Sequence, residues 1–183
     1  MVIWDAISAV DTSLLLEANT LFPSTTDSFW LLVTKTITWI PMYVLLLARL
    51  FQHSDTHSTW LFRTALIIVG VLIWDQGAEF FKHTIARPRP CHDVEGLRVL
   101  VYCSPHGFFS AHAANTFGLA FLTRNWLHKS WFPILLIAGI IQSFSRLHLG
   151  VHYPLDLLSG ALFGVIVARL LHRLDRQFLR KYM

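Results

Sequence analysis

Three short polar clusters in this chain contain residue types that can bind a phosphate group and transfer it. They span residues 82–90, 109–113 and 145–156. The first cluster carries Lys82 and Arg89, and the third carries Arg146. The planar fork of an arginine engages two phosphate oxygens, and a lysine adds a point charge. The three cations therefore predict a site for a phosphate dianion.

The second and third clusters supply two histidines, His112 and His152, and the carboxylate of Asp156. In a two-step transfer, one histidine attacks phosphorus and the other protonates the departing oxygen. Pro154 fits the first position of a helix, which leaves His152 just before that helix and Asp156 in its first turn. We expect Asp156 to accept the proton of one His152 ring nitrogen and to hold the other nitrogen toward a substrate.

A serine in the second cluster predicts an anion-binding helix end. Ser110 stands where an N-cap is expected, so the free backbone N–H groups of Ala111 and His112 are predicted to point at an anion. Singly, these residue types have ordinary explanations, because basic residues at a membrane edge usually anchor the chain and a serine before a helix usually only caps it. The spacing of the three clusters together favours catalysis.

The composition indicates which elements position these clusters. Hydrophobic residues make up 54% of the 183 residues and charged residues 14%, whereas about a quarter of a soluble domain is charged. Five segments approach the length of about 20 apolar residues that a bilayer-crossing helix needs. They are residues 28–50, 60–81, 110–127, 131–148 and 154–173.

Residues 3–18 have an apolar stripe at helical spacing, which predicts a helix lying in the membrane interface, with a short first span as the alternative.

We therefore predict an all-α integral membrane helical bundle with about five transmembrane helices and an N-terminal interfacial helix. A single domain covers residues 1–183, with the interfacial helix in 1–20, an outward loop in 82–109 and a cytoplasmic tail in 174–183. The net charge of +4 does not indicate nucleic-acid binding, because most Lys and Arg lie between apolar runs or at the C-terminal end. The sequence points to no obligate protein partner.

The distribution of positive charge predicts the orientation in a bacterial inner (plasma) membrane. With alternating crossings, nine cations fall on one side: Arg49, Arg63, Arg124, Lys129, Arg169, Arg173, Arg176, Arg180 and Lys181. Five fall on the other: Lys82, Arg87, Arg89, Arg98 and Arg146. The positive-inside rule places the side with nine, and the C-terminus, in the cytoplasm. All three clusters then meet at the face toward the periplasm or cell exterior.

Together the clusters resemble the three-part motif of the type-2 phosphatidic acid phosphatase superfamily, which includes bacterial lipid phosphatases, glucose-6-phosphatase and vanadium haloperoxidases. The resemblance covers residues 60–173 and implies a helical bundle and metal-independent hydrolysis without a cofactor. It implies that His112 is the general acid, His152 the nucleophile and Asp156 its orienting partner. The residues that it implies bind phosphate are Lys82, Arg89, Ser110, Ala111 and Arg146.

The second cluster departs from the family pattern. It reads Phe109-Ser110-Ala111-His112, where the family usually has Pro-Ser-Gly-His. Alanine keeps the backbone N–H but adds a methyl group and disfavours positive φ. We therefore expect the reaction to be kept, with altered phosphate contacts.

The resemblance implies a membrane lipid phosphate as substrate. A polyprenyl (undecaprenyl) diphosphate ranks first, because so short a chain has little loop mass for recognising a large headgroup. The alternatives are phosphatidylglycerophosphate, phosphatidate and a lipid A phosphate. A vanadate-dependent haloperoxidase is a remote alternative because that branch is soluble, and a non-enzymatic membrane protein is disfavoured by the presence of both histidines and Asp156.

Several other polar residues lie near the clusters. Arg87 falls outside the family spacing, and contact with substrate or with lipid headgroups stays open. Asn115, one turn after His112, is expected to help hold it, and Tyr153 to belong to an interfacial aromatic belt. Four further histidines near the clusters lack the spacing of a zinc site and are expected to be solvated. They are His83, His92, His106 and His148.

Two pairings complete the expectations. The two cysteines of the chain are Cys91 and Cys103. They lie in the loop that is predicted to be outside the cell, where oxidation is permitted. We therefore predict a disulfide, with two free thiols as the alternative.

Lys35 lies within a predicted span at about the depth of Asp75. A lysine at mid-bilayer is costly, so we predict a buried Lys35–Asp75 ion pair, with a lysine that snorkels upward as the alternative.

Overall fold

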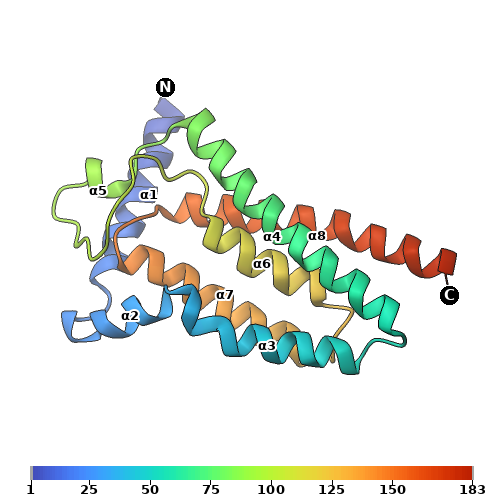
Figure 1. Cartoon of the computed structure of the whole chain (residues 1–183). Coiled ribbons are helices and arrows are strands. Elements are labelled where there is room, and N and C mark those ends of the chain that lie inside the picture. The colour runs from blue at the N-terminus through green and yellow to red at the C-terminus, as the bar shows by residue number, and fades with distance from the viewer. Residues whose placement is uncertain (1, 183) are drawn as a thin grey trace.

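The structure is a computed structural model that describes residues 2–182, and no strand occurs within that range (Figure 1). The elements in chain order are α1 (Val2–Thr20), η1 (Ser24–Thr26), α2 (Asp27–Val33), α3 (Thr36–Gln52), α4 (His57–Ile85), α5 (Pro90–Asp93), α6 (Ala111–Thr123), α7 (Trp131–His148) and α8 (Pro154–Tyr182). The predicted all-α class is confirmed.

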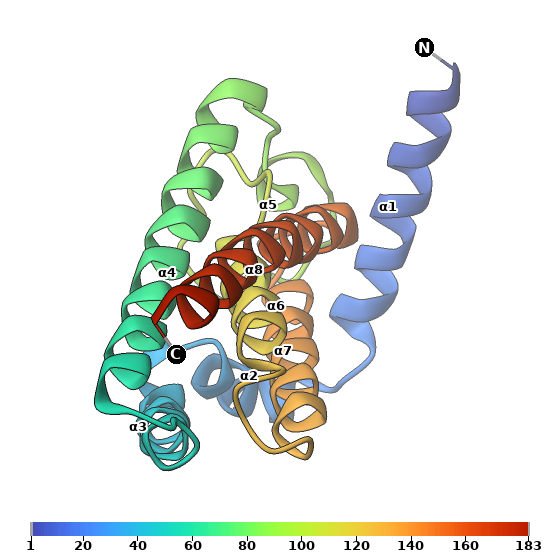
Figure 2. The same ribbon diagram turned by 90° about the vertical axis from the view of Figure 1, so that its right-hand side faces the viewer.

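Helix α6 lies inside the bundle, where it packs against α4, α7 and α8 (Figures 1 and 2). It has 13 residues, or about 20 Å at 1.5 Å per residue, and is shorter than the predicted span of 110–127. Small residues bring it close to α8. A Cβ atom at Gly160 would collide with the carbonyl oxygen of Ser110, and one at Gly164 would collide with that of Ala114. These glycines let the two backbones meet and so place Ser110 against α8.

Two helices, α4 and α8, are each long and apolar enough to cross a membrane, and α2 with α3 makes a third candidate if the bent pair counts as one span. Helix α4 runs beyond its predicted end to Ile85, and α8 continues through the expected tail to Tyr182. These helices support a membrane protein. The number of five spans stays a prediction.

The predicted span over residues 28–50 is not one helix. It breaks between α2 and α3, which are bent by 46°. Lys35 is the N-cap of α3 with φ −75° and ψ 130°, an extended conformation. Polar side chains bind carbonyl groups next to the break: Thr38 Oγ1 donates to the Leu32 oxygen at 2.6 Å, and Trp39 Nε1 donates to the Val33 oxygen at 2.7 Å. An irregular backbone at membrane depth needs such internal partners.

The predicted Lys35–Asp75 ion pair is wrong, because the helix breaks at Lys35. Lys35 is exposed at the bend, and the carboxylate of Asp75 instead accepts a hydrogen bond from Asn115 Nδ2 at 2.7 Å. The prediction assumed that residues 28–50 form one unbroken helix and estimated the depth of Lys35 along it, whereas the structure has two helices with a bend between them.

Helix α1 stands beside the bundle (Figure 2) and contacts α7 and α8. Its buried face carries Asp11, Leu15 and Asn19 at intervals of four residues, each at most 2% exposed. The opposite face exposes large apolar side chains, which are Ile3, Trp4, Ile7, Val10 and Leu14. The predicted N-terminal helix is thus present, and its position in the membrane interface stays a prediction.

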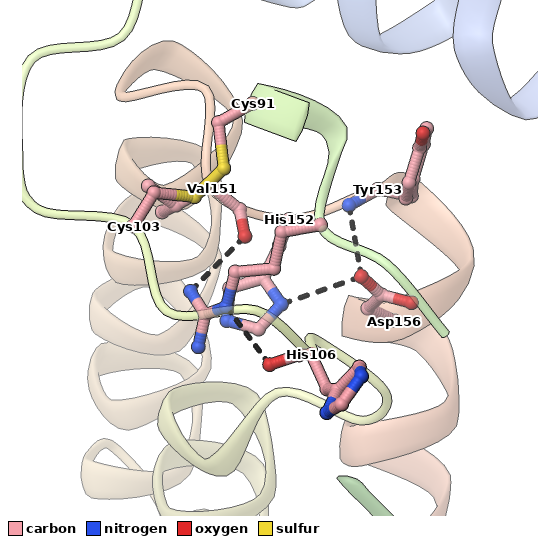
Figure 3. Close-up of a disulfide and its surroundings, with 8 residues drawn as sticks. Cys91, Cys103, His106, Val151, His152, Tyr153 and Asp156 are labelled. Atoms are coloured by element: carbon pink, nitrogen blue, oxygen red, sulfur yellow. Dashed lines mark hydrogen bonds and ion pairs between the residues drawn. A yellow bond between two sulfur atoms is a disulfide. The ribbon is translucent and has the colours of Figure 1, made fainter. Parts of the chain in front are cut away.

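The long connection between α4 and α6 is closed by a disulfide between Cys91 and Cys103, whose Cα atoms are 6.6 Å apart (Figure 3). The predicted bridge is confirmed. It closes a short loop over the site, and the side chain of Asn19 fastens that loop to the bundle. Its Nδ2 donates to the carbonyl oxygen of His148 at 2.7 Å, and its Oδ1 accepts from the backbone N–H of Arg98 at 2.9 Å.

Candidate active site

The three polar clusters meet at one end of the bundle, as predicted. Figure 1 shows the C-terminal end of α4, the start of α6 and the turn from α7 into α8 at the same end. Each helix contributes its residues from a terminus, where backbone groups and side chains are free to face a ligand.

At the centre of this end, His152 lies in the turn before α8, and its Nδ1 is 3.4 Å from Oδ2 of Asp156 (Figure 3). The same Asp156 oxygen accepts the backbone N–H of Tyr153 at 3.0 Å. The His152 side chain is 3% exposed and that of Asp156 is fully buried. The predicted contact between His152 and Asp156 is therefore present, and it leaves Nε2 as the ring nitrogen free to face a ligand.

Burial lowers the pKa of His152 to about 4. The hydrogen bond that Asp156 accepts from the ring opposes this shift, and the positive charges of Arg146 and Arg89 add to it. The ring is consequently neutral at ordinary pH, which is the form that has a lone pair to attack phosphorus.

Arg89 lies beside His152, held by two backbone carbonyl groups. Its Nε donates to the His106 oxygen at 3.0 Å and its Nη1 to the Val151 oxygen at 3.1 Å. Nη2 has no hydrogen-bond partner among residues 2–182. An arginine fixed by two of its nitrogens presents the third in a defined direction, which suits an anion.

Arg146, at the end of α7, reaches the break between α2 and α3. Its Nη1 donates to Thr34 Oγ1 at 2.6 Å, and its buried Nε has no partner within the described residues. His112, the second residue of α6, is close enough to Arg146 and His152 for their charges to act on its ring. The bend in the first span thus places a hydroxyl at the site, which a straight helix would not do.

Ser110 is the N-cap residue of α6, as predicted, but its side chain does not cap the helix. Its Oγ is buried and lacks a hydrogen-bond partner in the part of the chain that is described. Its backbone N–H donates to the Asp156 carbonyl oxygen at 3.0 Å, which ties the start of α6 to the first turn of α8. A buried hydroxyl without a partner is costly, so this atom indicates a place for a ligand oxygen.

Lys82 and Ala111 complete the predicted phosphate-binding set. Lys82 Nζ is 3.2 Å from Glu79 Oε2, one turn earlier on α4, so a substrate phosphate would compete with that carboxylate. Ala111 begins α6 and is followed by His112. The first N–H groups of this helix have no partner within the helix and carry its positive dipole end.

Arg87 has a role that the sequence did not indicate. Its Nη1 donates to Asp156 Oδ1 at 2.9 Å and its Nη2 to Asp11 Oδ2 at 2.6 Å. Its guanidinium carbon lies 4.0 Å from the centre of the Tyr153 ring. Asp11 also accepts the backbone N–H of Leu155 at 2.9 Å. Both expectations for Arg87, contact with substrate or with headgroups, are replaced by a buried bridge between α1 and Asp156.

Some of the other expectations are also corrected. Tyr153 is 5% exposed and packs under Arg87, so it is not a belt residue. His148 is fully buried, with Nε2 at 2.9 Å from Asp27 Oδ1, so it is not solvated. Asn115 does not hold His112, because Nδ2 donates to Asp75 and to the Ala111 carbonyl oxygen. These partners come from distant parts of the chain, which local spacing does not reveal.

Two of the remaining histidines have the exposure that was expected. His83 and His92 are exposed. His106 is half-buried, and its carbonyl oxygen supports Arg89.

As a whole, the site combines a neutral, oriented histidine with fixed cations, an unpartnered hydroxyl and a free helix N-terminus. All of these groups except the histidines donate hydrogen bonds or carry positive charge, so the arrangement suits a phosphate group held beside a nucleophile.

Comparison with known proteins agrees with this reading. The PAP2 superfamily pattern matches residues 58–180. A lipid A 4'-phosphatase from Bacteroides thetaiotaomicron is 31% identical over 165 residues, which cover 86% of this chain and 73% of that protein. Undecaprenyl-diphosphatase BcrC from Bacillus subtilis is 28% identical over 154 residues, 82% of this chain and 75% of that one.

A solved structure shares the fold. The transmembrane PAP2 type phosphatidylglycerolphosphate phosphatase from Bacillus subtilis superposes with a TM-score of 0.74 at 22% identity, covering 94% of this chain and 87% of that one. The sequence pattern spans more than half of this chain and includes all three clusters. The chain therefore belongs to the PAP2 superfamily and is a phosphatase of that family.

Proposed function

We propose that the chain hydrolyses a lipid phosphate or diphosphate through a phosphohistidine at His152. In the first step, the Nε2 lone pair of His152 forms a bond to the terminal phosphorus while the bond from phosphorus to the leaving oxygen breaks. His112, in its protonated form, gives its proton to that oxygen, and the lipid leaves as an alcohol from a monophosphate or as a lipid monophosphate from a diphosphate. In the second step, water attacks phosphorus and gives a proton to His112, the P–N bond breaks, and inorganic phosphate departs.

The observation that carries this proposal is the His152–Asp156 pair beside Arg89 and Arg146. Asp156 holds the ring proposed to attack. Arg89 and Arg146 are close enough to act on the charge of His152, so they would stabilise the charge that increases on the phosphate oxygens. The buried Ser110 Oγ has no partner within the described residues and would supply a further hydrogen-bond donor.

A lipid substrate is supported by the apolar helices that surround the site and by the names of the relatives. The similar proteins include one named as a lipid A 4'-phosphatase and one named as an undecaprenyl-diphosphatase. A polyprenyl diphosphate and a lipid A phosphate are therefore the two substrates to compare first. We place the site on the outer face of a bacterial inner membrane, on the ground of the nine-to-five charge distribution.

The deciding experiment measures inorganic phosphate released by detergent-purified protein from a panel of lipid phosphates and diphosphates, without added metal and with a chelator. His152→Ala should abolish release. His53→Ala removes an exposed histidine in the connection after α3 and should match wild type. Near-normal turnover in His152→Ala would show that another residue is the nucleophile.

A further inference from the structure

An apolar cavity of about 310 Å³ begins at the active site and runs between α3, α4, α6 and α7. His112 and Ala111 line it at the site, and Leu46, Ile67 and Leu119 line it farther along. A lipid whose phosphate lies beside His112 has room here for the first part of its apolar chain.

A carboxylate interrupts this apolar lining. Asp75 of α4 lines the same cavity and is exposed. Seven residues separate it from Lys82 on one helix, about 10 Å at 1.5 Å per residue. An ionisable side chain at membrane depth is costly and usually marks a functional position.

The contacts of Asp75 leave half of its carboxylate free. Oδ1 accepts a hydrogen bond from Asn115 Nδ2 at 2.7 Å, and the other hydrogen of that amide goes to the Ala111 carbonyl oxygen at 3.0 Å. These two bonds fix the Asn115 amide and therefore the carboxylate. Over residues 2–182, no Lys, Arg or His forms an ion pair with Asp75, and Oδ2 accepts no hydrogen bond. Asp75 thus presents a fixed acceptor to the cavity without the cationic partner that a structural role would call for.

A fixed acceptor in an apolar cavity discriminates among lipids by their hydrogen-bond donors. A polyprenyl chain has none, and the ester groups of a diacylglycerol only accept. An amide-linked or hydroxylated acyl chain carries an N–H or O–H within a few bonds of the headgroup. A site built to bind such a donor rejects an analogue that lacks it, because the acceptor is then left unpaired.

We propose that Asp75 is a specificity residue that accepts a hydrogen bond from a hydroxyl or amide N–H in the apolar part of the substrate, near its phosphate. This rests on the proposed hydrolysis of lipid phosphates and narrows its substrate class. Phospholipids with amide-linked or hydroxylated chains are the preferred class, as in glucosamine-based or sphingoid lipids, and polyprenyl phosphates are disfavoured.

The test compares ceramide 1-phosphate, which carries an amide N–H and a hydroxyl, with phosphatidate of matched chain length, which carries neither in its chains. We expect kcat/KM in mixed micelles to favour ceramide 1-phosphate by at least about tenfold in wild type. In Asp75→Leu the ratio should fall to near one. Gln76→Leu is the matched control, because it removes an exposed polar side chain at the next position of α4 and should keep the wild-type ratio.

A second readout does not need turnover. Each substitution is placed in a His152→Ala background, and the rise in thermal unfolding temperature with each lipid is measured in detergent. Asp75→Asn keeps the side-chain volume if the leucine variant does not fold, and it should reduce the preference for ceramide 1-phosphate. Two results would overturn the inference. One is equal binding of the two lipids by the His152→Ala protein that keeps Asp75, and the other is an unchanged preference when Asp75 is also replaced. If wild type releases phosphate from no lipid of the panel, the hydrolysis proposal fails, while the binding readout still decides the role of Asp75.

Discussion

The guanidinium of Arg87 lies 2.9 Å from the carboxylate of Asp156, the residue that orients His152. On its other side, Arg87 is 2.6 Å from Asp11 of α1. All three side chains are largely buried, with 14%, 0% and 2% exposure in the order Arg87, Asp156, Asp11. The catalytic carboxylate is thus fixed from behind by a helix that provides none of the motif residues.

This bridge predicts a large effect of Arg87→Ala. Two buried carboxylates would lose their shared cation, which costs about 3–5 kcal/mol of unfolding free energy. Displacement of Asp156 should also lower kcat by about 100-fold, because small misplacements of a catalytic group are expensive. Thermal unfolding and kcat in detergent measure the two effects. The milder Asp11→Asn keeps an acceptor for Leu155, so it should have smaller effects, and equal losses in both variants would argue against a positioning role.

The proposed intermediate predicts opposite behaviour in the two histidine variants. His152→Ala should lose at least about three decades in turnover, because the nucleophile is deleted. His112→Ala should accumulate phosphoprotein when the substrate has a good leaving group, because departure then needs little protonation. Intact-protein mass spectrometry detects the added phosphate. Phosphoprotein that persists in His152→Ala would place the covalent bond elsewhere.

The lowered pKa of His152 predicts the acid limb of the pH profile. With a pKa of about 4, the ring gains a proton and loses its nucleophilic lone pair as the pH falls through this value. We expect kcat/KM to fall below about pH 4 and to be independent of His152 protonation above about pH 5. Asp156→Asn should move the limb to lower pH, because the Asp156 hydrogen bond raises this pKa. A limb near the ordinary histidine value would show that His152 is less buried than described.

The contact between α6 and α8 predicts a steric effect of Gly160→Ala. Its methyl group would meet the Ser110 carbonyl oxygen, so we expect a loss of about 1–3 kcal/mol from overpacking. The shift should also weaken phosphate binding, since Ser110 begins α6. Thermal unfolding and the inhibition constant for inorganic phosphate measure the two effects. Ser159→Thr adds one methyl group at the neighbouring position and should change neither by as much.

The orientation is predicted to place the loop after α4 outside the cell. A cysteine at Glu95, in a background without Cys91 and Cys103, should react with an impermeant thiol reagent in intact spheroplasts. Glu95 is exposed and lies in the loop, so the reagent has access to it. A cysteine at Lys129, exposed at the opposite end of the bundle, is the control and should react only after lysis. The reverse pattern would invert the topology.

The convergence of the residues proposed to be catalytic could be predicted from the sequence because each lies at a helix end with a recognisable start or stop signal. Pro154 fixes where α8 begins, so the four-residue spacing of His152 and Asp156 was sufficient to place them together. The bridge from Arg87 to Asp11 joins positions 76 residues apart, and no local pattern reports such a pairing. The bend before Thr36 was missed for another reason: averaged hydrophobicity over residues 28–50 does not distinguish a straight span from a broken one, and the polar run Thr34-Lys35-Thr36 that marks the bend was treated as part of the span.

The bridge through Arg87 has a consequence for biosynthesis. Asp11 lies in α1 and Asp156 in α8, the first and the last helix of the described residues, so α1 is synthesised well before α8. A nascent chain that has inserted every helix except α8 contains the cations, Ser110 and His112, but neither the nucleophile's partner nor the bridge that steadies it. We therefore expect no hydrolysis from a nascent chain that has not yet inserted α8, so a partly inserted chain would leave the surrounding lipids unchanged.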